Sequence, residues 1–186
     1  MRIVAGKNRG RAVFAPKGLT TRPTSDRTRE SVFNILNSLL EGGFQGRVVA
    51  DLFAGTGALG LEALSRGAEY AVFVDNNREA IEIIGDNIQN FDEEKNTSLQ
   101  KCDATLLGLL PYGLSAVDVV FLDPPYEKNL VILALNSLVK NRWLAKGAVC
   151  IAEVGSKENF KCPAGFEQID QRKYGKAAIY ILKPIS

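Results

Sequence analysis

Histidine is absent from the sequence, and cysteine is scarce. Without histidine, no mechanism can use an imidazole base, and no Ser–His or Cys–His nucleophile pair can form. The three cysteines, Cys102, Cys150 and Cys162, are odd in number and far apart. We therefore expect reduced, mostly buried thiols, with neither a disulfide framework nor a metal site.

Long apolar runs are missing as well. No run approaches the ~20 residues of a membrane span, and the opening Met1–Lys7 has no signal-peptide core. With 186 residues and 46% hydrophobic content, the chain suits one domain that buries about 70% of its unfolded surface. We expect a cytoplasmic monomer with no membrane partner.

Acidic residues are lacking from the first 22 positions, which carry six lysines and arginines. The whole chain has a net charge of only +2, so the basic charge is concentrated at one end. Such a cluster is typical of a phosphate-binding arm, and the glycines within it predict a short hairpin. A solvated tail is the alternative. The residues expected to contact phosphate are Arg2, Lys7, Arg9, Arg11 and Arg22.

Over residues 48–60, an apolar run turns within two glycines into helix-forming sequence. This pattern predicts a strand, a tight turn and a helix that begins near Ala58. Gly55 and Gly57 allow positive φ and close approach of a ligand, and the helix start offers free backbone N–H groups. Such a turn is typical of a binding site for a nucleotide-like ligand.

The turn also fits the dinucleotide fingerprint, because Gly60 completes it and Asp75 follows Gly55 by twenty residues. Asp51, however, stands before the glycines, where it would repel a pyrophosphate and attract a cationic amino group. S-adenosylmethionine carries such an ammonium, and Asp75 would bind its ribose hydroxyls. Asp51 as a simple cap of the turn is the alternative.

From Arg47 onward, predicted strands alternate with helices, which is typical of a parallel sheet covered on both faces. We expect a doubly wound, Rossmann-like sheet of seven strands, with an antiparallel hairpin at Tyr174-Gly175 near its end. The division would be a basic arm over 1–22 and one globular domain over 23–186. The expected strands are 47–53, 70–74, 97–101, 117–122, 147–153, 165–172 and 177–183, and the expected helices are 31–40, 58–66, 77–90, 104–110 and 128–140.

Acids follow successive predicted strands at the edge where ligands bind in such sheets. Asp103 comes after the strand 97–101 and would accept a hydrogen bond from the adenine amine, unless it serves only as a helix N-cap. The residues expected to contact the cofactor are Asp51, Phe53, Gly55, Gly57, Asp75 and Asp103.

The fourth strand leads into Asp123, Pro124, Pro125 and Tyr126. An exocyclic amine of a base has its lone pair delocalised into the ring. The Asp123 carboxylate and the Pro124 carbonyl could accept its two N–H bonds and direct the nitrogen at a methyl donor. The proline pair stiffens the turn, and Tyr126 offers a face for stacking. A rigid loop without a catalytic role is the alternative.

These motifs resemble class I S-adenosylmethionine-dependent methyltransferases, and specifically the bacterial RsmD type, which methylates guanine N2 in 16S ribosomal RNA. The resemblance runs nearly end to end. The matching blocks are residues 2–6, Arg9-Gly10-Arg11, Arg22-Pro23-Thr24-Ser25-Asp26-Arg27, Phe33-Asn34-Ile35-Leu36, residues 51–57, residues 60–68 and Asp123-Pro124-Pro125-Tyr126.

The resemblance implies S-adenosylmethionine as cofactor and ribosomal RNA, free or in an assembling small subunit, as partner. The residues alone support only an exocyclic amine of a base, so a DNA adenine or cytosine, or a tRNA guanine, stays open as target. A non-enzymatic RNA-binding module explains the basic arm but not the acids. Arg22–Glu30 would close the cofactor site, touch RNA, or form ordinary surface ion pairs.

Overall fold

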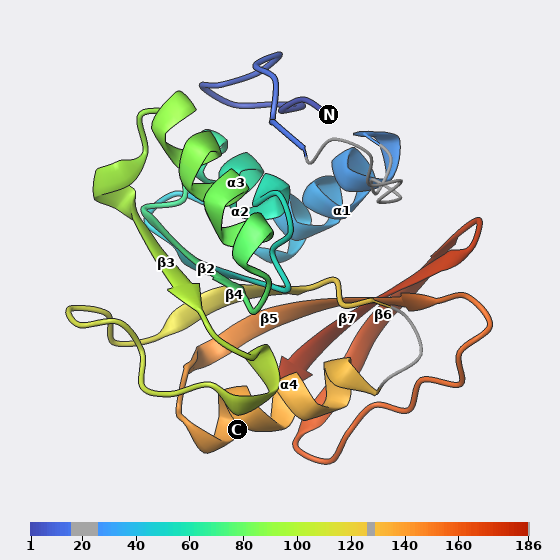
Figure 1. Ribbon diagram of the computed structural model, residues 1–186. Coiled ribbons are helices and arrows are strands. Elements are labelled where there is room, and N and C mark those ends of the chain that lie inside the picture. Colours follow the sequence, from blue (N-terminus) through green and yellow to red (C-terminus); the bar gives the residue numbers. More distant parts are fainter. Residues whose placement is uncertain (16–25, 126–128, 186) are drawn as a thin grey trace.

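The computed structural model describes residues 1–15, 26–125 and 129–185 of the chain. A seven-stranded sheet with the order β3-β2-β1-β4-β5-β7-β6 forms its middle (Figure 1). Strands β3, β2, β1, β4 and β5 are parallel, and β7 pairs antiparallel with both β5 and β6. This confirms the predicted fold class. The strands are β1 (Val48–Leu52), β2 (Tyr70–Asp75), β3 (Thr97–Lys101), β4 (Val117–Leu122), β5 (Leu144–Gly155), β6 (Phe166–Tyr174) and β7 (Ala177–Pro184).

Helices cover both faces of the sheet. Figure 1 shows α1, α2 and α3 on one face and α4 on the other. The central strands are buried on both sides: Val49 belongs to the core under α1–α3, and Leu52 to the core under α4. The helices are α1 (Asp26–Leu39), α2 (Ala58–Ser65), α3 (Arg78–Asn90) and α4 (Leu130–Lys140), with short 3₁₀ turns at η1 (Glu94–Asn96) and η2 (Ala104–Leu106). None of these described helices is long and apolar enough to cross a membrane.

Three expected elements differ clearly from the structure. The helix expected over 31–40 begins earlier, at Asp26. The helix predicted over 104–110 is only the single turn η2, because the N–H of Leu107 donates to Ser137 Oγ, and the carbonyl of Gly108 accepts from Trp143 Nε1. Tertiary hydrogen bonds thus replace helical ones. Strand β5 is longer than the predicted 147–153, since its last residue, Gly155, still pairs with Ala177 of β7.

The cysteines are all free, as expected, but the prediction of mostly buried thiols is wrong. Only Cys150 is buried, whereas Cys102 and Cys162 are half-buried. Burial raises the pKa of the Cys150 thiol to about 12. It is therefore a packing residue of the core under α4 rather than a nucleophile.

The N-terminal residues 1–15 form a hairpin-like turn that packs over α2 and α3 (Figure 1). Arg2 and Ala12 form an antiparallel bridge, and the N–H of Ile3 donates to the carbonyl of Arg11. The side chains of Ile3 and Val13 are buried in the main core. This stretch, called the N-terminal hairpin below, is therefore held by core packing, and the boundary predicted at residue 22 lies outside the described residues.

Candidate functional site

The turn between β1 and α2 has the strained backbone that its sequence requires. Phe53, directly after β1, has a φ of 60°, and Gly55 and Gly57 have φ values of 57° and 75°. A Cβ added to Gly55 would meet nothing closer than 4.0 Å, so the space beside it is open. A Cβ on Gly60 would lie 2.3 Å from the Phe73 ring, so this glycine allows α2 to pack on β2. The open side of the turn is thus at Gly55.

Asp51 lies inside β1 and is only 2% exposed. Its Oδ2 accepts a 2.9 Å hydrogen bond from the N–H of Gly60. Burial raises the pKa of Asp51 to about 7, against the lowering effect of the Gly60 hydrogen bond, and the nearby Asp75 raises it further. The carboxylate therefore holds the first turn of α2, and no described residue forms an ion pair with it.

Asp75 ends β2 and orients the glycine turn. Its Oδ2 accepts from the N–H of Gly55 at 2.9 Å, and its Oδ1 accepts from the N–H of Asn77 at 2.8 Å. The carboxylate retains lone pairs for further donors. Asp75 thus lies at the glycine turn, where the sequence placed it.

Asp103 follows β3 and caps η2, since its Oδ1 accepts from the N–H of Thr105 at 2.8 Å and from Thr105 Oγ1 at 2.7 Å. The N-cap role considered for this acid is therefore real. Its strand still ends beside β2, because Lys101 pairs with Asp75. A ligand contact by Asp103 remains a prediction.

Asp123 and Pro124 come directly after β4, next to the glycine turn. Leu52 of β1 pairs with Val74 of β2 on one side and Leu122 of β4 on the other. Asp75 and Asp123 consequently sit at matching positions on the two strands that flank β1. Asp123 is half-buried, Pro124 is buried and Pro125 is exposed. Tyr126 lies outside the described residues.

A further acid belongs to this row. Glu153 of β5 comes one position after Ala152, which pairs with Leu122, so it neighbours Asp123 across the sheet. Sequence reasoning missed it, although an acid near the end of a predicted strand was the signal used for the others. Core residues on the face under α1–α3 precede these acids by two positions. Strand alternation therefore directs the acids that lie within strands, Asp51, Asp75 and Glu153, to that same face. The four acids are Asp51, Asp75, Asp123 and Glu153, and the residues that precede them are Val49, Phe73, Phe121 and Ile151.

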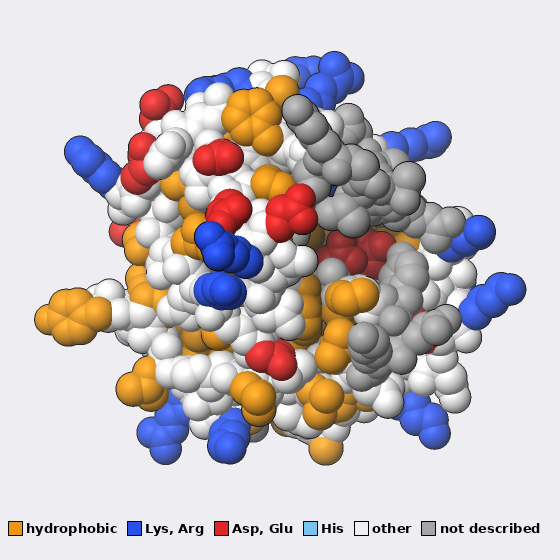
Figure 2. Space-filling model, viewed as in Figure 1, with side chains coloured by type: hydrophobic (Ala, Val, Ile, Leu, Met, Phe, Trp, Pro, Cys, Tyr) orange, Lys and Arg blue, Asp and Glu red, His pale blue; other side chains and the backbone are white. Residues whose placement is uncertain are grey.

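A cavity of about 280 Å³ adjoins the end of β4. Pro124 and Phe160 contribute apolar walls, and Glu153 and Glu158 contribute acids. The segment that contains Glu158 and Phe160 thus lies close to Pro124 and Pro125. Figure 2 shows that acidic side chains gather near the middle of the viewed face.

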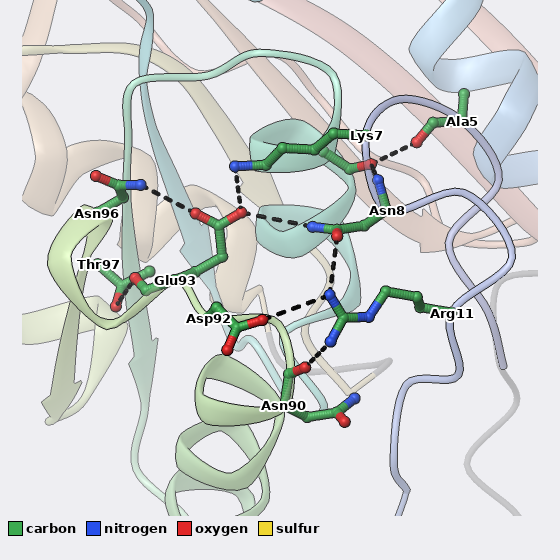
Figure 3. A network of polar contacts seen from close by, with 10 residues as sticks. Ala5, Lys7, Asn8, Arg11, Asn90, Asp92, Glu93, Asn96 and Thr97 are labelled. Atoms are coloured by element: carbon green, nitrogen blue, oxygen red, sulfur yellow. Dashed lines mark hydrogen bonds and ion pairs between the residues drawn. The ribbon is translucent and has the colours of Figure 1, made fainter.

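Two basic residues of the N-terminal hairpin, Lys7 and Arg11, have interaction partners within the protein (Figure 3). Lys7 Nζ lies 2.6 Å from Oε1 of the buried Glu93. The Arg11 guanidinium packs 4.9 Å from the centroid of the Phe91 ring and donates to Asn8 Oδ1 and to the carbonyl of Asn90. Both side chains remain partly exposed. Their first role is to attach the hairpin to the end of α3.

The other basic candidates differ among themselves. Arg9 is exposed, and no described residue forms an ion pair with it. Arg2 is exposed but has an interaction partner, and its carbonyl accepts from Arg29. Arg29 is buried near Glu62, so this arginine of the Arg22–Glu30 block has a structural role. Arg22 lies outside the described residues.

Buried polar side chains connect the hairpin to the glycine turn. Glu62 of α2, fully buried, accepts from the N–H groups of Val4 and Ala5 at 2.7 and 3.0 Å. Asn87 of α3, also fully buried, accepts from the N–H of Phe14 at 2.8 Å and donates to the carbonyl of Thr56 at 2.9 Å. Asn87 therefore joins the N-terminal hairpin to the glycine turn by hydrogen bonds to both.

Comparisons with known proteins identify the family of this chain. The family described as conserved hypothetical protein 95 matches residues 1–183. Ribosomal RNA small subunit methyltransferase D of Escherichia coli K12 is 34% identical over 153 residues, which cover 82% of this chain and 74% of the relative. The protein of that name from Haemophilus influenzae is 31% identical over 177 residues, covering 94% of this chain and 89% of the relative.

Solved structures give the same picture. That of the Escherichia coli protein yhhF superposes with a TM-score of 0.84 at 28% identity, covering 99% of this chain and 97% of the other. A hypothetical protein from Thermus thermophilus superposes with a TM-score of 0.74 at 26% identity, covering 97% of this chain and 98% of the other. The chain belongs to the conserved hypothetical protein 95 family, and the RsmD resemblance drawn from its motifs is confirmed.

Proposed function

We propose that this protein is an S-adenosylmethionine-dependent methyltransferase that methylates the exocyclic N2 amine of a guanine in small-subunit ribosomal RNA. The observation that carries the proposal is the pairing of Leu52 with both Val74 and Leu122. It sets the acid of the glycine turn, Asp75, and the acid of the Asp-Pro-Pro-Tyr turn, Asp123, on either side of β1. A cofactor and an amine can therefore meet over one strand end.

The residues present fit S-adenosylmethionine. Gly55 leaves open space beside the turn, Asp51 would face the ammonium, and Asp75 would accept from the ribose hydroxyls. When bound, the cofactor supplies an electrophilic methyl group on a sulfonium. Asp51 is the strongest argument for a cationic ligand, because a buried carboxyl with a pKa of about 7 gains most from a nearby positive charge.

On the acceptor side, Asp123 and the Pro124 carbonyl would accept the two N–H bonds of the amine and orient its nitrogen. The amine becomes acidic as it forms its new bond to carbon, so its proton can leave to Asp123 or water late in the reaction, and no histidine is needed. Tyr126 would stack on the base, and Arg2, Lys7, Arg9, Arg11 and Arg22 would contact the RNA backbone. Positioning is therefore the main contribution of the chain.

The names of the relatives support ribosomal RNA as the substrate, and guanine N2 is the finer part of the proposal. The test is to incubate the protein with tritiated S-adenosylmethionine and 16S ribosomal RNA, both free and in small subunits that lack the modification. Nucleoside analysis should then place the label in N2-methylguanosine. Label in methyladenosine or methylcytidine would refute the substrate, and no label in either preparation would support the RNA-binding module instead.

A further inference from the structure

The cavity beside β4 has features suited to a planar base. Its volume of about 280 Å³ is near the lower end of small-molecule pockets, about 300–1,000 Å³. Apolar lining comes from Pro124, Val131, Val154 and Phe160, and acids come from Glu153 and Glu158. Lysine and arginine do not occur among the described residues that line it. The two carboxylates favour a group that presents hydrogen-bond donors.

The two acids of the cavity, Glu153 and Glu158, have different interactions within the protein. Glu158 Oε1 accepts from the N–H of Gly155 at 2.9 Å, which closes the turn after β5. Glu153 is half-buried within β5, next to Asp123 across the sheet, as the pairing of Ala152 with Leu122 requires. Neighbouring strands are about 4.8 Å apart. Glu153 and Asp123 can therefore reach adjacent atoms of one small ring system.

Guanine presents two kinds of donor side by side on its Watson–Crick edge, the N2 amine and N1–H. Adenine presents its N6 amine beside N1, which has no hydrogen and would be repelled by a carboxylate. Enzymes that act on a flipped base commonly read this edge by hydrogen bonds. A carboxylate beside the one that holds the amine would thus select guanine.

We propose that Glu153 is the residue that specifies guanine, by accepting a hydrogen bond from N1–H of the base whose N2 amine is held at Asp123 and Pro124. A carboxylate has about four lone-pair positions, so this role is compatible with the interaction Glu153 already makes. The base would enter the cavity between Pro124 and Phe160. This inference rests on the proposed function.

The test compares Glu153→Gln with Glu158→Gln in single-turnover methyl transfer to 16S ribosomal RNA at saturating cofactor. Glutamine keeps the size of glutamate, and in Glu158→Gln it keeps an oxygen for the Gly155 N–H. Both variants remove one negative charge from the same cavity. We expect Glu153→Gln to slow transfer to guanine at least tenfold, as the loss of a charge-assisted hydrogen bond does. Glu158→Gln should slow it by a clearly smaller factor, because the Glu158 carboxylate already accepts from the N–H of Gly155.

Melting temperature and S-adenosylmethionine affinity should be unchanged in both variants. If Glu153→Gln lowers the melting temperature, Glu153→Asp decides instead, because it keeps the charge but withdraws the carboxylate by one CH₂ group, and we expect a loss of at least fivefold. A wild-type protein that labels guanine N2 while these variants keep near-normal rates would overturn the role of Glu153. Equal losses in Glu153→Gln and Glu158→Gln would also overturn it, in favour of a general charge effect. Absence of guanine labelling by the wild type would instead overturn the proposed function.

Discussion

Asp75 Oδ2 accepts a 2.9 Å hydrogen bond from the N–H of Gly55, so the end of β2 fixes the turn that follows β1. The second oxygen is held by the N–H of Asn77. Two backbone donors from different loops thus orient one carboxylate before any ligand arrives. This preorganisation favours a ligand that needs an acceptor of fixed direction, such as a pair of ribose hydroxyls.

Replacement of Asp75 should weaken binding of the cofactor. We expect Asp75→Ala to reduce S-adenosylmethionine affinity by roughly 1.5–3 kcal/mol, because a charged acceptor and the anchor of Gly55 are lost together. Calorimetric titration measures the effect. Asp86→Ala, on the exposed face of α3, is the control and should bind normally. Unchanged affinity in Asp75→Ala, with tight NADH binding by the parent, would contradict the cofactor assignment.

Cofactor affinity should depend on pH through Asp51. Its pKa of about 7 means that the carboxyl is largely protonated at pH 6 and largely ionised at pH 8. A cationic ligand binds the ionised form, so affinity should fall below pH 7 and approach a tenfold loss per unit. Calorimetry between pH 6 and 8 tests this, with Asp51→Asn as the variant in which the pH dependence should disappear.

The stability of the free protein should change with pH in the opposite sense. Between the usual pKa of 3.8 and about 7, folded Asp51 keeps a proton that the unfolded chain has released. The free energy of unfolding is therefore highest, as far as this group is concerned, below pH 3.8. It decreases as the pH rises to about 7 and is constant above that. Urea unfolding of the parent and Asp51→Asn across this range should show the difference in slope, and parallel curves would argue against the raised pKa.

Arg9 and Arg11 should separate RNA binding from folding. Arg9 is exposed, so Arg9→Ala should weaken RNA binding, flatten its salt dependence by about 0.7–0.9 for one lost phosphate contact, and leave the melting temperature unchanged. Arg11→Ala should lower stability by about 1 kcal/mol, because it removes the contacts with Asn8 and Phe91. Filter binding at several salt concentrations and thermal melting measure both. An unchanged salt slope in Arg9→Ala would mean that this arginine does not touch RNA.

Asn87 should couple the N-terminal hairpin to the glycine turn. Asn87→Ala leaves the N–H of Phe14 and the carbonyl of Thr56 without their partner, which should cost about 1–3 kcal/mol of stability and weaken cofactor binding. Asn90→Ala is the matched control, since Asn90 donates a solvent-exposed hydrogen bond to the carbonyl of Ala12 in the same hairpin. Similar melting temperatures for the two variants would show that the buried bonds of Asn87 are not a support of the turn.

Asp123 should act mainly on the transition state. We expect Asp123→Ala to lower kcat by about 10²-fold or more, on the scale of losing a positioned polar group near developing charge. Dissociation constants for RNA and cofactor should change by less than about tenfold. Single-turnover transfer at saturating RNA and cofactor gives the comparison, and a near-normal rate would mean that the Asp-Pro-Pro-Tyr turn has only a structural role.

Tyr126→Ala should instead raise KM and lower kcat together, because binding of the base is impaired.

The sequence by itself determined the features that depend on neighbours along the chain. The apolar run before Gly55 and Gly57 requires a strand, a turn with positive φ and a helix, and the structure has them at Val48–Leu52 and Ala58–Ser65. The alternation of strands and helices likewise predicted a parallel sheet with acidic residues at the ends of successive strands. These properties follow from local periodicity and turn chemistry, which a single sequence displays.

Only the tertiary structure decided which distant residues meet. The register of β4 and β5 makes Glu153 a neighbour of Asp123, and the path of the chain after β5 brings Phe160 to Pro124. Lys7, expected to be free for phosphate, has the buried Glu93 as its partner. Strand register and long-range ion pairs depend on how separate segments pack in three dimensions, and local sequence patterns do not contain that information.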